Sequence, residues 1–275
     1  MRRFTTSAGT ERLFLGLLLL VELIVAVALL WRPTPMPARV SPAPTIAPAP
    51  TSHTLTLRDG RTATLLPLGG ARATGLATRI AAELDSATEA VTAFWGDGWR
   101  RDVEIVATGT DEEFAAMGTS GSDIAAATTP ERIVFAPGAA DMSDAALRIV
   151  VRHELFHYAA RADTAADAPR WLTEGVADFV GRPPQSRPGP ALAAELAQVP
   201  TDADLDTPGA TRSLAYDRAW WFSRFVADRY GLQTLRKLYL EACRPGHPDA
   251  TTAIHDALGA DLSNVVASWR QWLSG

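Results

Sequence analysis

The stretch IVVRHELFHYAA, residues 149–160, constrains the fold most strongly, because it sets two imidazoles four residues apart within a helical pattern. Its flanking apolar residues predict a helix, so His153 and His157 should project from one face, one turn apart. That arrangement can chelate a metal ion, and Glu154, rotated by about 100°, is placed to contact a water held by the metal. The alternative is that the two histidines are half-exposed residues of an ordinary amphipathic helix.

A second motif, PRWLTEGVADFVG at residues 169–181, supplies a candidate for the third ligand that a catalytic zinc site needs. Pro169 opens a predicted helix, and Glu174 follows His157 by 17 residues, which leaves room for a short loop and a returning helix. Asp178, one turn beyond Glu174, could accept the second N–H of a ligand histidine and fix its tautomer, or it could be a solvated acid.

These motifs resemble those of the gluzincin metallopeptidases, and among them the bacterial peptidase MA-like domains. The resemblance rests on H-E-L-F-H at 153–157, on W-L-T-E-G at 171–175 with Asp178 after it, and on SLAYDRAWWFSRFVADRYGLQTLRKLYL at 213–240. It covers roughly residues 130–273. The two-part zinc motif is specific, and the tyrosine-containing helix is moderately so.

The resemblance implies one Zn²⁺ held by His153, His157 and Glu174, with Glu154 as the general base that deprotonates the metal-bound water. It implies a peptide or protein substrate, aligned along the strand RIVFAP at 132–137 as an edge strand. A tyrosine or histidine outside the zinc motif often stabilises the oxyanion in this family. Tyr216 is the candidate here, with a packed tyrosine bonded to backbone as the alternative.

The periodicity along the rest of the chain predicts an α+β fold, a small N-terminal mixed sheet with a helix followed by a mostly helical half. The resemblance implies that this is the thermolysin-like catalytic architecture of the gluzincins. Alternating runs around Asp59-Gly60 predict a hairpin, and strands are expected at 102–108 and 132–137. Helices are expected at about 75–96, 110–117, 143–161, 169–181, 213–230, 232–242, 249–258 and 261–273, with a short helical patch at 191–198 in the proline-rich connection.

The N-terminal residues 13–31 form a nearly unbroken apolar run whose helical length approaches that of a bilayer core. Arginines at positions 2, 3 and 12 precede it, so the positive-inside rule predicts a cytoplasmic segment 1–12 and an extracytoplasmic remainder. The run predicts a transmembrane signal anchor in the cell membrane, with a cleaved signal peptide as the alternative. A Pro/Ala-rich linker, 32–52, would separate it from one metallopeptidase domain, 53–275.

The composition excludes some functions and leaves others open. A formal net charge of −5 provides no basic field for a nucleic acid, and the one cysteine, Cys243, cannot form an internal disulfide. Cys243, His247 and His255 are better explained by a loop between helices than by cysteine catalysis. The alternative to a peptidase is a catalytically silent, membrane-tethered binding module that retains the peptidase fold. The sequence leaves the oligomeric state open.

Overall fold

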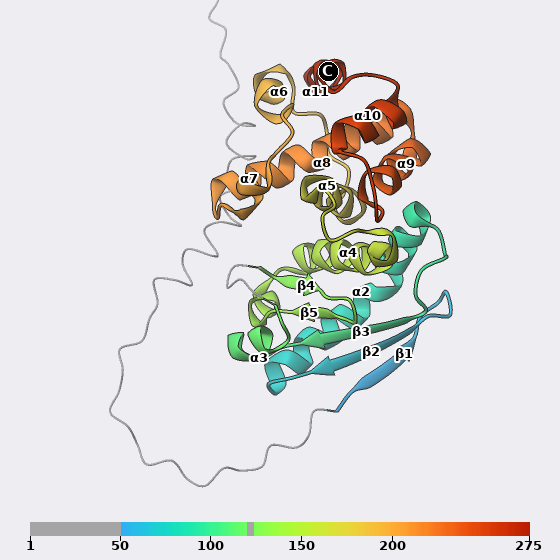
Figure 1. Cartoon of the computed structure of the whole chain (residues 1–275). Helices are drawn as coiled ribbons and strands as arrows, with labels where there is room; N and C mark the ends of the chain where they lie inside the picture. The colour runs from blue at the N-terminus through green and yellow to red at the C-terminus, as the bar shows by residue number, and fades with distance from the viewer. Residues whose placement is uncertain (1–50, 120–123) are drawn as a thin grey trace, which may run out of the picture. The chain divides into compact units, whose positions relative to one another are not determined.

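A five-stranded mixed sheet opens the part of the chain described by the computed structural model, residues 51–119 and 124–275 (Figure 1). Its order is β1-β2-β3-β5-β4, in which the β2–β3 and β3–β5 pairs are parallel and the two outer pairs are antiparallel. The strands are β1 (His53–Thr56), β2 (Thr62–Pro67), β3 (Asp102–Ala107), β4 (Ala126–Thr128) and β5 (Ile133–Phe135). The predicted hairpin is confirmed, since Gly60 adopts φ +82° in the turn between β1 and β2.

Helices cover both faces of the sheet. Helix α2 (Ala71–Trp95) packs one buried side against β2 and β3, where it meets the inward-facing Ile105 and Phe135. The short α3 (Asp111–Ala116) lies over the other face, where Phe114 packs with Val106 and Val134. Successive residues of β3 and β5 therefore point into two different apolar clusters, which explains why both strands are continuous apolar runs.

The remainder of the described chain is helical and stacks onto α2 through α4 (Figure 1). Helix α4 packs against α2 on one side and α5 on the other, and α5 packs against α8. The helices are α4 (Asp144–Ala160), α5 (Arg170–Gly181), α6 (Pro190–Leu196), α7 (Asp202–Asp206), α8 (Ala210–Tyr230), α9 (Leu232–Cys243), α10 (Ala250–Leu258) and α11 (Leu262–Ser274). The predicted α+β class, a small mixed sheet followed by a mostly helical part, is confirmed.

The predicted strand at 132–137 is present, but its expected position in the sheet was wrong. The strand expected to lie at the edge, β5, runs between β3 and β4, and the three-residue β4 occupies the edge instead. The sequence AAT of β4 shows neither alternation nor a β-branched run, so its strand character comes from pairing with β5. The edge strand beside α4 is therefore β4, which makes contacts with that helix.

The predicted membrane location is also corrected. Within residues 51–119 and 124–275, no helix combines the length and the apolar character needed to cross a bilayer. The predicted anchor at 13–31, the segment 1–12 and nearly all of the linker 32–52 lie outside the described residues. The predicted single-pass membrane location is therefore not supported by any helix within the described residues.

Candidate metal centre

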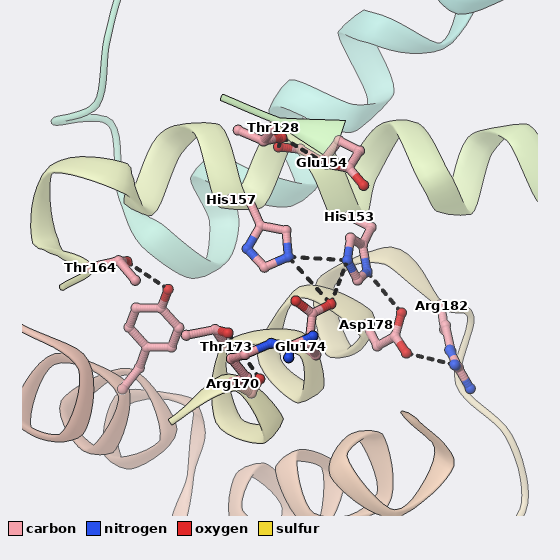
Figure 2. A network of polar contacts seen from close by, with 11 residues as sticks. Thr128, His153, Glu154, His157, Thr164, Arg170, Thr173, Glu174, Asp178 and Arg182 are labelled. Atoms are coloured by element: carbon pink, nitrogen blue, oxygen red, sulfur yellow. Dashed lines mark hydrogen bonds and ion pairs between the residues drawn. The ribbon is translucent and has the colours of Figure 1, made fainter. Parts of the chain in front are cut away.

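Helix α4 presents the two histidines of the first motif. Ser143 caps its N-terminus by accepting a hydrogen bond from the Ala146 N–H at 3.2 Å. Leu147, Val151 and Leu155 anchor the opposite side of the helix in the core, so the two imidazoles face α5 (Figure 2). The Nε2 atoms of His153 and His157 approach to 3.1 Å, as expected for two histidines one turn apart on a helix.

Helix α5 brings Glu174 to the same point. Its Oε2 lies 3.2 Å from His153 Nε2 and 3.6 Å from His157 Nε2. The adjacent Gly175 lets α5 pack closely on α8, because a Cβ there would meet the Ala219 carbonyl oxygen at 2.5 Å. The close packing of α5 between α4 and α8 thus fixes the position of the glutamate.

The three side chains form a group that could hold a metal ion. Their ligand atoms, two imidazole nitrogens and one carboxylate oxygen, all lie within 4.8 Å of one another. Two imidazoles and one carboxylate make a ligand set that suits a divalent transition metal, and three protein ligands leave a coordination position open. The residues present therefore fit a metal of this class.

The electrostatics of the group favour a cation. Burial opposes the charge on His153, but hydrogen bonds to the Asp178 and Glu174 carboxylates outweigh it and raise the pKa of this imidazole. Burial likewise opposes the charge on Glu174, yet the facing His157 and His153 hold the pKa of this carboxyl well below its usual range. Glu174 is therefore an anion at neutral pH, as a metal ligand must be.

Behind His153 lies a chain of buried charges. His153 Nδ1 is 2.9 Å from Asp178 Oδ1, so the Nδ1–H donates to that carboxylate and Nε2 is left for a metal. Arg182 forms an ion pair with Asp178, Nη2 to Oδ2 at 2.6 Å (Figure 2). It forms a second ion pair with Asp217, Nη1 to Oδ1 at 2.7 Å. Burial is outweighed by the Arg182 guanidinium, which keeps the pKa of Asp178 low. Arg182 therefore stabilises the anion that orients the His153 imidazole.

Glu154 is not part of this group. Its side chain points toward β4, where Thr128 Oγ1 lies 2.7 Å from Oε2 and 3.0 Å from the Glu154 main-chain oxygen (Figure 2). Only 8% of the residue is exposed. The different orientation follows from its position on the helix, about 100° from His153.

A cavity of about 350 Å³ connects these residues. Its walls come from β4, α4, the α4–α5 connection, α5 and Tyr216 of α8. Burial and the carboxylates around it raise the pKa of Tyr216, so its hydroxyl keeps its proton at neutral pH. The predicted site residues His153, Glu154, His157, Glu174 and Tyr216 all line this cavity, and Asp178 lies directly behind His153.

Other candidates from the sequence do not join the site. Cys243 is fully buried, His255 is exposed beside Asp256, and His247 lies near Asp167; none of the three lines the cavity. Thr128 and Arg182 were missed. Arg182 had a weak signal, since it follows Asp178 by one helical turn, whereas Thr128 had none because β4 had not been predicted.

No family model matches the chain, and no curated protein matches it.

Proposed function

We propose that the protein is a zinc metallopeptidase of the gluzincin type, with a thermolysin-like catalytic arrangement, that hydrolyses peptide bonds. One observation carries the proposal: His153, His157 and Glu174 converge on a point that shares a cavity with a separate carboxylate, Glu154. The two ligand histidines and the base thus come from different faces of α4, and the third ligand comes from α5. Two imidazoles and a carboxylate favour zinc over the harder ions Mg²⁺ and Ca²⁺, which take mainly oxygen ligands.

When bound, zinc would polarise the substrate carbonyl and lower the pKa of the attacking water. Glu154 would accept the proton of that water and pass it to the leaving amine. Thr128, by holding Oε2 of Glu154, would leave Oε1 for this proton transfer. Tyr216, neutral and within the cavity wall, would donate a hydrogen bond to the oxyanion. Asp178 would hold His153 in the tautomer that a metal requires.

The edge strand β4 supplies a place for the substrate backbone. Residues Ala126, Ala127 and Thr128 line the cavity, and on one side β4 pairs with β5. An extended peptide could add to the other side of β4 by main-chain hydrogen bonds, with its carbonyl toward the metal group. This assigns to β4 the role that the sequence had suggested for the strand RIVFAP.

Metal content of the purified full-length chain, measured by mass spectrometry, tests the ligand set. We expect about one zinc per chain in the wild type, and its loss in Glu174→Ala. Glu89→Ala is the matched control, because Glu89 is exposed on α2 and does not line the cavity. A wild-type chain that holds no zinc after zinc is supplied would contradict the proposal.

Turnover is tested separately with a pool of synthetic peptides whose products are identified by mass spectrometry. We expect Glu154→Gln to keep its zinc and to lose hydrolysis by a factor on the order of 10³. A zinc-loaded wild type that cleaves no peptide would instead favour the alternative, a binding module that retains the peptidase fold.

A further inference from the structure

The two helices of the metal group face each other in a regular antiparallel order. His153 lies beside Asp178, at 2.9 Å, and His157 lies beside Glu174, at 3.6 Å. Arg161 lies one helical turn after His157, at the end of α4, and Arg170 lies one turn before Glu174, at the start of α5. The two arginines are therefore the next pair in this order. Arg161 is the C-cap residue of α4 and still has helical φ and ψ, so it continues the spacing of the two histidines.

Both arginines line the cavity, at the end nearest the α4–α5 connection. Figure 2 shows Arg170 beside Thr173 and Glu174 on α5. Between the two arginines, the connection contributes Ala165, Ala166 and Ala168 to the wall. Each of these three side chains is a single methyl group, so this part of the wall carries no bulky side chain.

Within the described residues, neither arginine forms an ion pair with an acid that lines the cavity. Across the described residues, Arg161 has no ion-pair or hydrogen-bond partner for its side chain, which is exposed. Arg170 uses Nη1 to contact Asp206 at 2.8 Å, in an exposed pair that water screens and that contributes little. The acids of the lining, Glu154 and Glu174, balance the two arginines, so a bound divalent ion would leave the cavity positive.

We propose that Arg161 and Arg170 form a carboxylate-binding subsite, so that the protein prefers peptides with a carboxylate close to the cleaved bond. The proposal rests on the peptidase function for the identity of the substrate. A guanidinium group binds a carboxylate through two parallel N–H···O bonds, which favours a carboxylate over a neutral amide. One helical turn is about 5.4 Å, and an extended peptide advances about 3.4 Å per residue, which places the carboxylate within two or three residues of the bond.

The carboxylate can come from an aspartate or glutamate side chain or from a free C-terminus of the peptide. Measuring how peptides bind to the zinc-loaded full-length Glu154→Gln chain distinguishes these two sources without cleaving the peptides. The probes are three fluorescein-labelled pools of octapeptides in one alanine-serine background. One carries a single glutamate at each position in turn and one a single glutamine, both with amidated C-termini. The third is the glutamine pool with a free C-terminus.

We expect the glutamate pool or the free C-terminal pool to bind about tenfold more tightly than the amidated glutamine pool, by fluorescence anisotropy. Adding Arg161→Gln or Arg170→Gln should remove most of this preference while the zinc content stays unchanged. Arg229→Gln is the matched control, because it removes the same charge from an exposed position on α8 outside the cavity. It should keep the preference.

Equal affinity for the three pools, no binding of any pool, or a preference that survives both arginine substitutions would overturn the subsite. The two proposals fail in different ways. Cleavage of peptides by the wild type with no carboxylate preference would overturn the subsite alone. A carboxylate preference that depends on Arg161 and Arg170, in a wild-type chain that cleaves none of the pools, would contradict the peptidase and support the subsite.

Discussion

Thr128 on the edge strand β4 lies 2.7 Å, Oγ1 to Oε2, from the carboxylate of Glu154 on α4. The same hydroxyl is 3.0 Å from the Glu154 main-chain oxygen, and with one hydrogen it donates to one of these acceptors at a time. The contact couples the strand that would bind the substrate backbone to the residue that would transfer the proton.

Replacing Thr128 with valine should therefore slow turnover without affecting the metal. A hydrogen bond to a charged group contributes about 1.5–3 kcal/mol, so its loss should lower kcat by roughly ten- to a hundredfold. Thr128→Ser, which keeps the hydroxyl, should retain most of the activity. The measurement is steady-state kinetics beside zinc content; an unchanged kcat in Thr128→Val would show that the contact does not position Glu154.

Asp178→Asn should weaken metal binding. The amide cannot replace the negative charge that accepts the His153 Nδ1–H, and the loss of such a partner typically costs ten- to a hundredfold in metal affinity. Competition with a chelating dye measures the effect. Asp228→Asn, at an exposed position on α8, should leave the affinity unchanged. Equal affinities in the two variants would mean that Asp178 has no influence on the ligand histidine.

Gly175→Ala should destabilise the fold, because the new Cβ would lie 2.5 Å from the Ala219 oxygen in the α5–α8 contact. Overpacking of this kind costs about 1–3 kcal/mol. Gly75→Ala provides the opposite case, since Gly75 lies within α2 and a Cβ there meets nothing within 4 Å. It should stabilise the protein by up to about 1 kcal/mol. Denaturant unfolding of both variants compares them directly, and the prediction fails if Gly175→Ala unfolds at the wild-type midpoint.

Cys243 should be unreactive in the native protein. Burial raises the pKa of its thiol to about 12, so at pH 8 almost none is present as the nucleophilic thiolate. Iodoacetamide at pH 8 should therefore label the denatured chain and leave the folded chain unlabelled, as mass spectrometry would show. Labelling of the folded chain at the rate of the denatured one would indicate that α9 opens readily.

The features predicted from the sequence are those with a local signal. His153 and His157 share a face because they are one helical turn apart, and the apolar spacing around them required a helix. The same reasoning located α5 and placed Glu174 and Asp178 on one side of it. The Asp59-Gly60 turn was recognisable because its two residues are typical of tight hairpins.

The features that were missed depend on contacts between distant segments. Strand β4 is three residues long and exists through its pairing with β5, so Thr128 could not be assigned to the site. Arg182 was visible as a neighbour of Asp178, but its second partner, Asp217, comes from α8. Arg161 and Arg170 could be paired at one end of the cavity only once α4 and α5 were known to be antiparallel.

The helical pair α4 and α5 has a kinetic consequence. Every residue of the metal group, and Asp178 behind it, lies within the short stretch 153–178, so bringing them together closes only a small loop. The parallel pairing of β2 with β3 must instead bridge the whole of α2, from Thr62 to Asp102. Because loop closure slows folding as sequence separation grows, we expect the helical pair to assemble before the sheet is complete. The parallel pairing of β2 with β3 would then be among the last contacts to form.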